Sequence, residues 1–106
     1  MMRAIERIRK ADSSRDRVAD FEFNGETIPL KVRVYPIREF QQIVERLDQS
    51  SEEGCLRFLS EQFSDPETGA PVFTVDDLLD SSMALNRSLL LFFGAVNKGD
   101  FDQKKI

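Results

Sequence analysis

The segment FEFNGETIPL, residues 21–30, determines how the first part of this 106-residue chain folds. Asn24-Gly25 is a strong signal for a two-residue hairpin turn, because both central residues of a type I′ turn need positive φ. Pairing outward from the turn sets Phe23 opposite Glu26, Phe21 opposite Ile28, and Ala19 opposite Leu30. The apolar residues then share one face, which Val32 and Val34 continue, while Thr27, Lys31, Arg33 and Tyr35 point away. Pattern and turn agree on one register, so the segment predicts a β-hairpin with one buried face.

Pro29 lies inside the second predicted strand, where it cannot donate a hydrogen bond. In this register it occupies a non-hydrogen-bonded pair, so its nitrogen points away from the partner strand. The hairpin tolerates the proline, whereas another strand is discouraged from docking there. An isolated hairpin is only marginally stable in water, so we expect helices to cover its apolar face.

A half-buried helix is expected directly after the hairpin. Pro36 ends the second strand and suits the first turn of a helix. Apolar residues then follow with spacings of i, i+3, i+4 and i+7, at Phe40, Ile43, Val44 and Leu47. We expect about three helical turns with this stripe facing the core.

The next predicted helix starts at Ser50-Ser51-Glu52-Glu53, a segment typical of a capping box. Its apolar side comprises Cys55, Leu56, Leu59 and Phe63, with Phe58 at the flank. The helix should end at Ser64-Asp65-Pro66, because a proline disfavours helical geometry in the residue before it.

Two more helices complete the chain after a turn-rich connector. Thr74 and Asp77 predict a second capping box, at the start of a short helix over residues 75–80. Ser81-Ser82 offers a cap for a last helix over residues 83–97.

Together these segments predict an α+β fold, in which an N-terminal β-hairpin packs on a bundle of about four short helices. We expect one domain over residues 18–97, a length that suits a single core. Residues 1–17 form a flexible basic arm or a short helix, with Ile5 and Ile8 at helical spacing. We expect residues 98–106 to form a flexible tail.

Charge is unevenly distributed along the chain. Residues 1–17 carry six Lys or Arg against three Asp or Glu, a net charge of +3, whereas residues 18–97 carry six against fourteen, a net charge of −8. With +1 from residues 98–106, these give the −4 of the whole chain. Phosphates are repelled by such a body, so the charge disfavours nucleic acid as a partner.

The sequence also indicates the cellular compartment in which the protein works. Its longest apolar run is shorter than the roughly 20 residues that cross a bilayer, and no secretory signal is recognisable. Cys55 is the single cysteine and cannot form an internal disulfide. An intracellular, reducing setting is therefore expected, with no membrane partner.

The residues that usually carry catalysis or bind metals are scarce. The chain has no His and one Cys, so the commonest general base, the commonest metal ligand and any cysteine zinc cluster are excluded. The acidic pairs Glu52-Glu53 and Asp76-Asp77 lie at helix starts, where capping explains them. We expect no enzyme activity, no catalytic residues, no cofactor and no metal.

The most apolar stretch is SLLLFFGAV, residues 88–96. It fits a central core helix that is covered on several sides, and it also fits a partly exposed patch for a partner. A chain of this length has few elements with which to cover every side. The candidate partner-binding residues are therefore Leu89, Leu90, Leu91, Phe92 and Phe93.

The blocks FEFNGETIPLKVRVYPIREF and DPETGAPVFTVDDLLDSSMALNRSLLLFFGAVN resemble the small tail assembly chaperones of long-tailed bacteriophages. In that family a turn with Asp and Gly leads into a capped helix, and a final helix closes near an Asn. The matching residues are Asp65, Gly69, Val72-Phe73-Thr74, Asp76-Asp77-Leu78 and Val96-Asn97. The resemblance spans residues 18–97.

The resemblance implies a protein that works in the host cell cytoplasm and is absent from the mature virion. It would bind the tape measure protein and keep it soluble during tail tube assembly. The implied partners are the tape measure protein, the tail tube protein and further copies of the chain. The Leu89–Phe93 run would supply part of the client surface.

Two other functions stay open at this point. One is a non-enzymatic interaction or adaptor module that uses the same helix for another partner. The other is a small nucleic-acid-binding protein that uses the basic arm, through Arg3, Arg7, Arg9, Lys10, Arg15 and Arg17.

Overall fold

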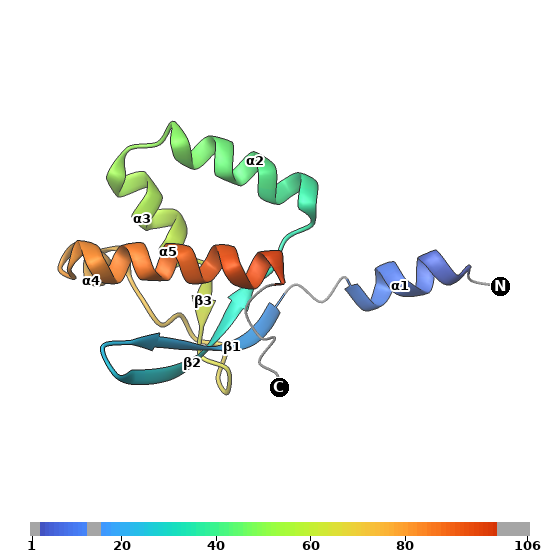
Figure 1. The fold of residues 1–106 in the computed structure, drawn as a ribbon, viewed down its shortest axis with the longest axis horizontal. Helices are drawn as coiled ribbons and strands as arrows, with labels where there is room; N and C mark the ends of the chain where they lie inside the picture. Colours follow the sequence, from blue (N-terminus) through green and yellow to red (C-terminus); the bar gives the residue numbers. More distant parts are fainter. Residues whose placement is uncertain (1–2, 13–15, 100–106) are drawn as a thin grey trace.

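The computed structural model describes residues 3–12 and 16–99 (Figure 1). In chain order its elements are α1 (Ala4–Asp12), β1 (Asp16–Phe23), β2 (Glu26–Arg33), α2 (Ile37–Asp48), α3 (Glu52–Ser60), β3 (Phe63–Ser64), α4 (Val75–Leu79) and α5 (Met83–Lys98). The α+β class is as predicted from the sequence. Of the expected tail, residues 100–106 lie outside the described residues.

Strands β1 and β2 form the predicted hairpin in the predicted register. Asn24 and Gly25 have φ angles of 51° and 86°, as the turn requires. Each of the three facing pairs expected from the sequence occurs. The residues of this face that are buried are Ala19, Phe21, Leu30 and Val32. Turn chemistry and alternating burial therefore fix the same register.

Strand β3 is a difference from the prediction, which placed Phe63 in a helix. It extends the sheet to three strands in the order β1-β2-β3, through the pairs Val32–Phe63 and Lys31–Ser64. Helix α3 ends at Ser60 instead. The unpaired edge of β2 competes with the helix for this backbone, and the strand leaves Phe63 almost fully buried.

The caps agree with the prediction in one case and differ in the other. At α4, the Asp77 N–H donates to Thr74 Oγ1 (3.0 Å) and the Thr74 N–H donates to Asp77 Oδ2 (2.9 Å), so the capping box is confirmed. At α3, Ser51 accepts from the Gly54 N–H (3.1 Å). Glycine at that third helical position has no side chain to reach back, so the predicted reciprocal box was wrong.

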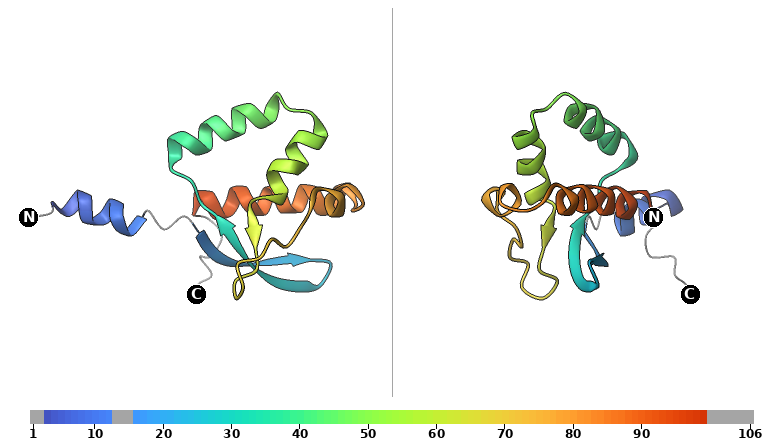
Figure 2. Two further views of the ribbon diagram at one scale, coloured as in Figure 1. Left: turned by 180° about the vertical axis from the view of Figure 1, so that it is seen from behind. Right: turned by 60° about the vertical axis from the view of Figure 1, so that its left-hand side comes forward.

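Helix α5 runs through the middle of the molecule, with the sheet on one side and α2 and α3 on the other (Figures 1 and 2). Its neighbouring aromatic residues pack in opposite directions. The Phe92 ring contacts Phe21 and Phe63 of the sheet, with centroid distances of 5.2 and 6.1 Å. The Phe93 ring contacts Phe40 of α2 and Phe58 of α3, at 5.9 and 5.6 Å. A helix between two layers needs apolar residues on two sides, which accounts for much of the apolar run.

Tyr35 also differs from the prediction, which pointed it away from the core. Its ring meets Phe93 edge to face at 6.2 Å, and its hydroxyl donates to Gln62 Oε1 at 2.7 Å. Strand β2 ends at Arg33, so strand alternation no longer applies to Tyr35.

Asn97 ties the end of α5 to the link between β2 and α2. Its Oδ1 accepts from the Tyr35 N–H at 2.8 Å, and its Nδ2 donates to the Arg33 carbonyl at 3.1 Å. One amide side chain therefore satisfies backbone groups where the strand has ended and the next helix has not begun.

Candidate partner-binding groove

The structure divides the candidate partner-binding residues into two groups. Leu89, Phe92 and Phe93 are buried in the core. Leu90 and Leu91 remain at the surface, with 43% and 68% of their area exposed. Three residues of the apolar run therefore belong to the core, and two lie at the surface.

Leu90 borders an apolar groove between α2 and α5, with a volume of about 240 Å³. The helices that form its walls lie one above the other in Figure 1. Its apolar lining consists of Phe40, Ile43, Val44, Leu47, Leu90, Phe93 and Gly94. We call this lining the α2–α5 groove.

The α2 wall is more exposed than the sequence suggested. Ile43 is buried and Phe40 packs against the core, but 42% of Val44 is exposed. Ile37, two turns earlier on the same side of α2, is 78% exposed. The expectation that Val44 faces the core was wrong, because the apolar stripe is wider than the side of α2 that packs against the core. Its outer edge faces the groove.

The α5 wall is formed by Leu90 and Gly94, which lie one helical turn apart on the same side. A Cβ atom built on Gly94 meets no heavy atom within 4 Å. Close packing within the chain therefore does not require glycine at this position. Its lack of a side chain keeps this end of the groove open.

Two charged residues complete the lining, Asp48 at the end of α2 and Lys98 at the end of α5. Among the described residues neither side chain forms an ion pair. Glu45 lies on the exposed surface of α2, one turn before Gln49. An apolar floor with charged ends suits an amphipathic helix, which docks through residues spaced i, i+3, i+4 and i+7.

The rest of the described chain holds few groups that suggest chemistry. Cys55 is partly buried, with its Sγ 3.4 Å from the Leu47 carbonyl oxygen. Within the described ranges, no three His, Cys, Asp or Glu residues are grouped as metal ligands would be. Nor does any described helix combine the length and apolar character needed to cross a membrane.

The groove could be found only in part from the sequence. The apolar run pointed to Leu90, but Val44 and Gly94 were not recognised as part of a site. Helical periodicity marks a core position and a groove position alike, so the pattern of α2 carried no signal that separates them. Comparisons of the chain with protein-family models, curated proteins and solved structures found no match.

Proposed function

We propose that this protein is a tail assembly chaperone of a long-tailed bacteriophage, which binds the tape measure protein and keeps it soluble while the tail tube assembles. The α2–α5 groove is the observation that carries the proposal. It offers an apolar groove of about 240 Å³ on a body of residues 18–97 whose net charge is −8. The sequence resemblance to this chaperone family names the client.

In the proposed mechanism, an apolar helix of the tape measure protein lies along the groove. Val44 on one wall and Leu90 on the other contact it, and Gly94 leaves room for a large client side chain. Burial of apolar surface drives binding, at roughly 25 cal/mol per Å² removed from water. No step needs a catalytic group or a cofactor.

The acidic surface has a separate role in this mechanism. Many chaperones on one long client give a complex with high negative charge, and like charges keep such complexes apart. The work takes place in the host cytoplasm, and the chaperones leave before the virion is complete. Contacts with the tail tube protein and between copies of the chain belong to the same assembly.

Co-expression with the tape measure protein of the same phage tests the proposal. The soluble fraction of the tape measure protein is measured with the wild-type chain, with Leu90→Asp, and with Leu79→Asp. Leu79 is a matched control, because it is 49% exposed on α4 but does not line the groove. Wild type and Leu79→Asp should raise the soluble fraction, and Leu90→Asp should not.

Two results would overturn parts of the proposal. No solubilisation by the wild-type chain would remove the chaperone function. Equal solubilisation by wild type and Leu90→Asp would remove the groove as the client site.

A further inference from the structure

Helix α1 has an apolar face that the other described residues leave largely exposed. Ala4, Ile5 and Ile8 lie on one side of this nine-residue helix. Ile5 is 44% exposed and Ile8 is 62% exposed. A helix of this length is marginal in water by itself, and amphipathic helices gain most of their stability from packing. The face therefore needs a surface to dock on.

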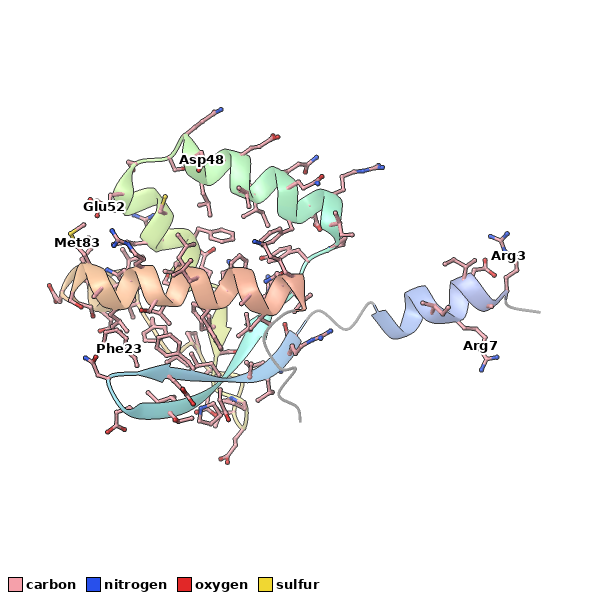
Figure 3. All side chains as sticks on the ribbon, in the orientation of Figure 1. Arg3, Arg7, Phe23, Asp48, Glu52 and Met83 are labelled. Carbon is pink, nitrogen blue, oxygen red and sulfur yellow. The ribbon has the colours of Figure 1, made fainter. Side chains whose placement is uncertain are left out.

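Within one molecule, no described part of the chain provides that surface in this arrangement. Helix α1 extends away from the sheet and the other helices in Figure 1 and in the left view of Figure 2. Its one described side-chain cap is internal, from the Arg3 N–H to Glu6 Oε1 at 2.9 Å. Figure 3 shows Arg3 and Arg7 extending from opposite sides of the helix.

The α2–α5 groove has the complementary properties. Its walls are apolar, and its two charged lining residues are Asp48 and Lys98, so the charge match lies between the whole arm and the whole body. The arm that contains α1 has a net charge of +3, whereas residues 18–97 have a net charge of −8. An amphipathic helix on a basic arm complements an apolar groove on an acidic body, by its apolar face and by net charge.

We propose that α1 of one copy docks in the α2–α5 groove of a second copy, so that two copies exchange their N-terminal helices. Ile5 and Ile8 contact Val44 and Leu90 of the other copy, and the basic arm lies against its acidic body. Exchange in both directions follows from two-fold symmetry and doubles the buried area. A single short helix would bury far less than the roughly 1,600 Å² of a standard interface.

The exchange gives α1 a role in client binding, and this part rests on the proposed function. If the groove takes a client helix, then α1 of a second copy covers the same apolar surface until a client arrives. The chaperone would then be protected from aggregation when free, and a client would have to displace α1.

Disulfide trapping between two single-cysteine chains tests the exchange. In a Cys55→Ser background, an Ile8→Cys chain is mixed with a Val44→Cys chain under mild oxidation. The control replaces Val44→Cys with Leu79→Cys, which has similar exposure outside the groove. We expect the Ile8–Val44 mixed dimer to form about tenfold faster than the control, the ratio given by a modest docking preference.

Three outcomes would overturn the exchange. The first is an equal rate of disulfide formation in the two mixtures, and the second is a disulfide between two Ile8→Cys chains as the main product. The third is an intramolecular disulfide in a dilute chain that carries both Ile8→Cys and Val44→Cys. The second would show pairing of α1 with α1, and the third would place α1 in the groove of its own chain.

Sedimentation gives an independent measure that does not involve cysteines. The wild-type chain should sediment as a dimer and the Ile8→Asp variant as a monomer. Val18 is exposed on β1, and the Val18→Asp variant should remain a dimer. A monomeric wild-type chain at high concentration would overturn the exchange. Disulfide trapping without solubilisation of the tape measure protein would support the exchange and contradict the chaperone function. Solubilisation without trapping would support the chaperone function and contradict the exchange.

Discussion

At the scale of single residues, position on a helix decides what an apolar side chain does. Phe92 and Phe93 are neighbours in sequence, yet one ring meets the sheet and the other meets α2 and α3. Leu91, the residue before this pair, is mostly exposed. Residue type alone does not separate these roles, but the 100° turn between successive helical residues does.

The Phe93 ring should be among the most costly side chains to remove. Phe93→Ala deletes a buried ring that contacts three aromatic side chains, so we expect unfolding to become easier by about 3–5 kcal/mol. Leu91→Ala should change stability by less than about 0.5 kcal/mol. Urea unfolding of both variants checks this, and a similar loss in the two would contradict the packing described.

Asn97 should contribute through its hydrogen bonds rather than through its area. Asn97→Ala leaves the Tyr35 N–H and the Arg33 carbonyl without this partner, which we expect to cost about 1–3 kcal/mol. Ser88→Ala on the same helix is the control, because the described structure gives the Ser88 hydroxyl no such link. Thermal unfolding compares the two, and equal melting temperatures would argue against the bridge.

Asp65 should give part of the stability a dependence on pH. The backbone N–H groups of Thr68 and Glu67 donate to its carboxylate, and they lower the pKa of Asp65 below the usual 3.8. A lowered pKa in the folded state stabilises the fold above the unfolded pKa, and this contribution is lost as pH falls through the folded value.

The measurement for Asp65 compares wild type with Asp65→Ala across acid pH. The variant should be less stable at neutral pH, and the difference should shrink as pH falls below about 3.8 and the carboxylate is protonated. A difference that stays constant to the lowest pH would show that the charge of Asp65 has no part in the turn.

At the scale of elements, the sequence predicts the features that depend on residues close together in the chain. It misses the features that depend on contacts between distant segments. The hairpin register follows from Asn24-Gly25 and alternation, and the α4 cap follows from Thr74 and Asp77 alone. Strand β3 depends on the free edge of β2, which local periodicity does not reveal. The groove depends similarly on where α2 lies relative to α5, so the sequence located Leu90 but not Val44 as part of the site.

Gly94 also belongs to the scale of elements, because it lies inside a long helix at a position where packing does not require a glycine. Alanine is a better helix former than glycine by about 1 kcal/mol. The space beside Gly94 is open, so we expect Gly94→Ala to raise stability by about that amount. Guanidinium unfolding measures the change, and a loss of stability would show a hidden contact at the groove.

At the scale of the whole molecule, one helix serves both the core and the surface. Helix α5 joins the sheet to α2 and α3 through one part of its circumference, and it forms a wall of the groove with another. The body around the groove is acidic, and the N-terminal arm that extends away from it is basic. The molecule thus combines an apolar groove with a net charge far from zero, and such a charge limits aggregation.

Binding of the tape measure protein to Gly94→Leu, with Gly94→Ala as its matched control, tests the central claim most directly. The Cβ position of residue 94 is unobstructed and lines the groove, so we expect both variants to fold at least as stably as wild type. We predict wild-type affinity for Gly94→Ala and about tenfold or greater weakening for Gly94→Leu. Undiminished binding by a stably folded Gly94→Leu variant would contradict the claim that a helix of the client occupies the α2–α5 groove.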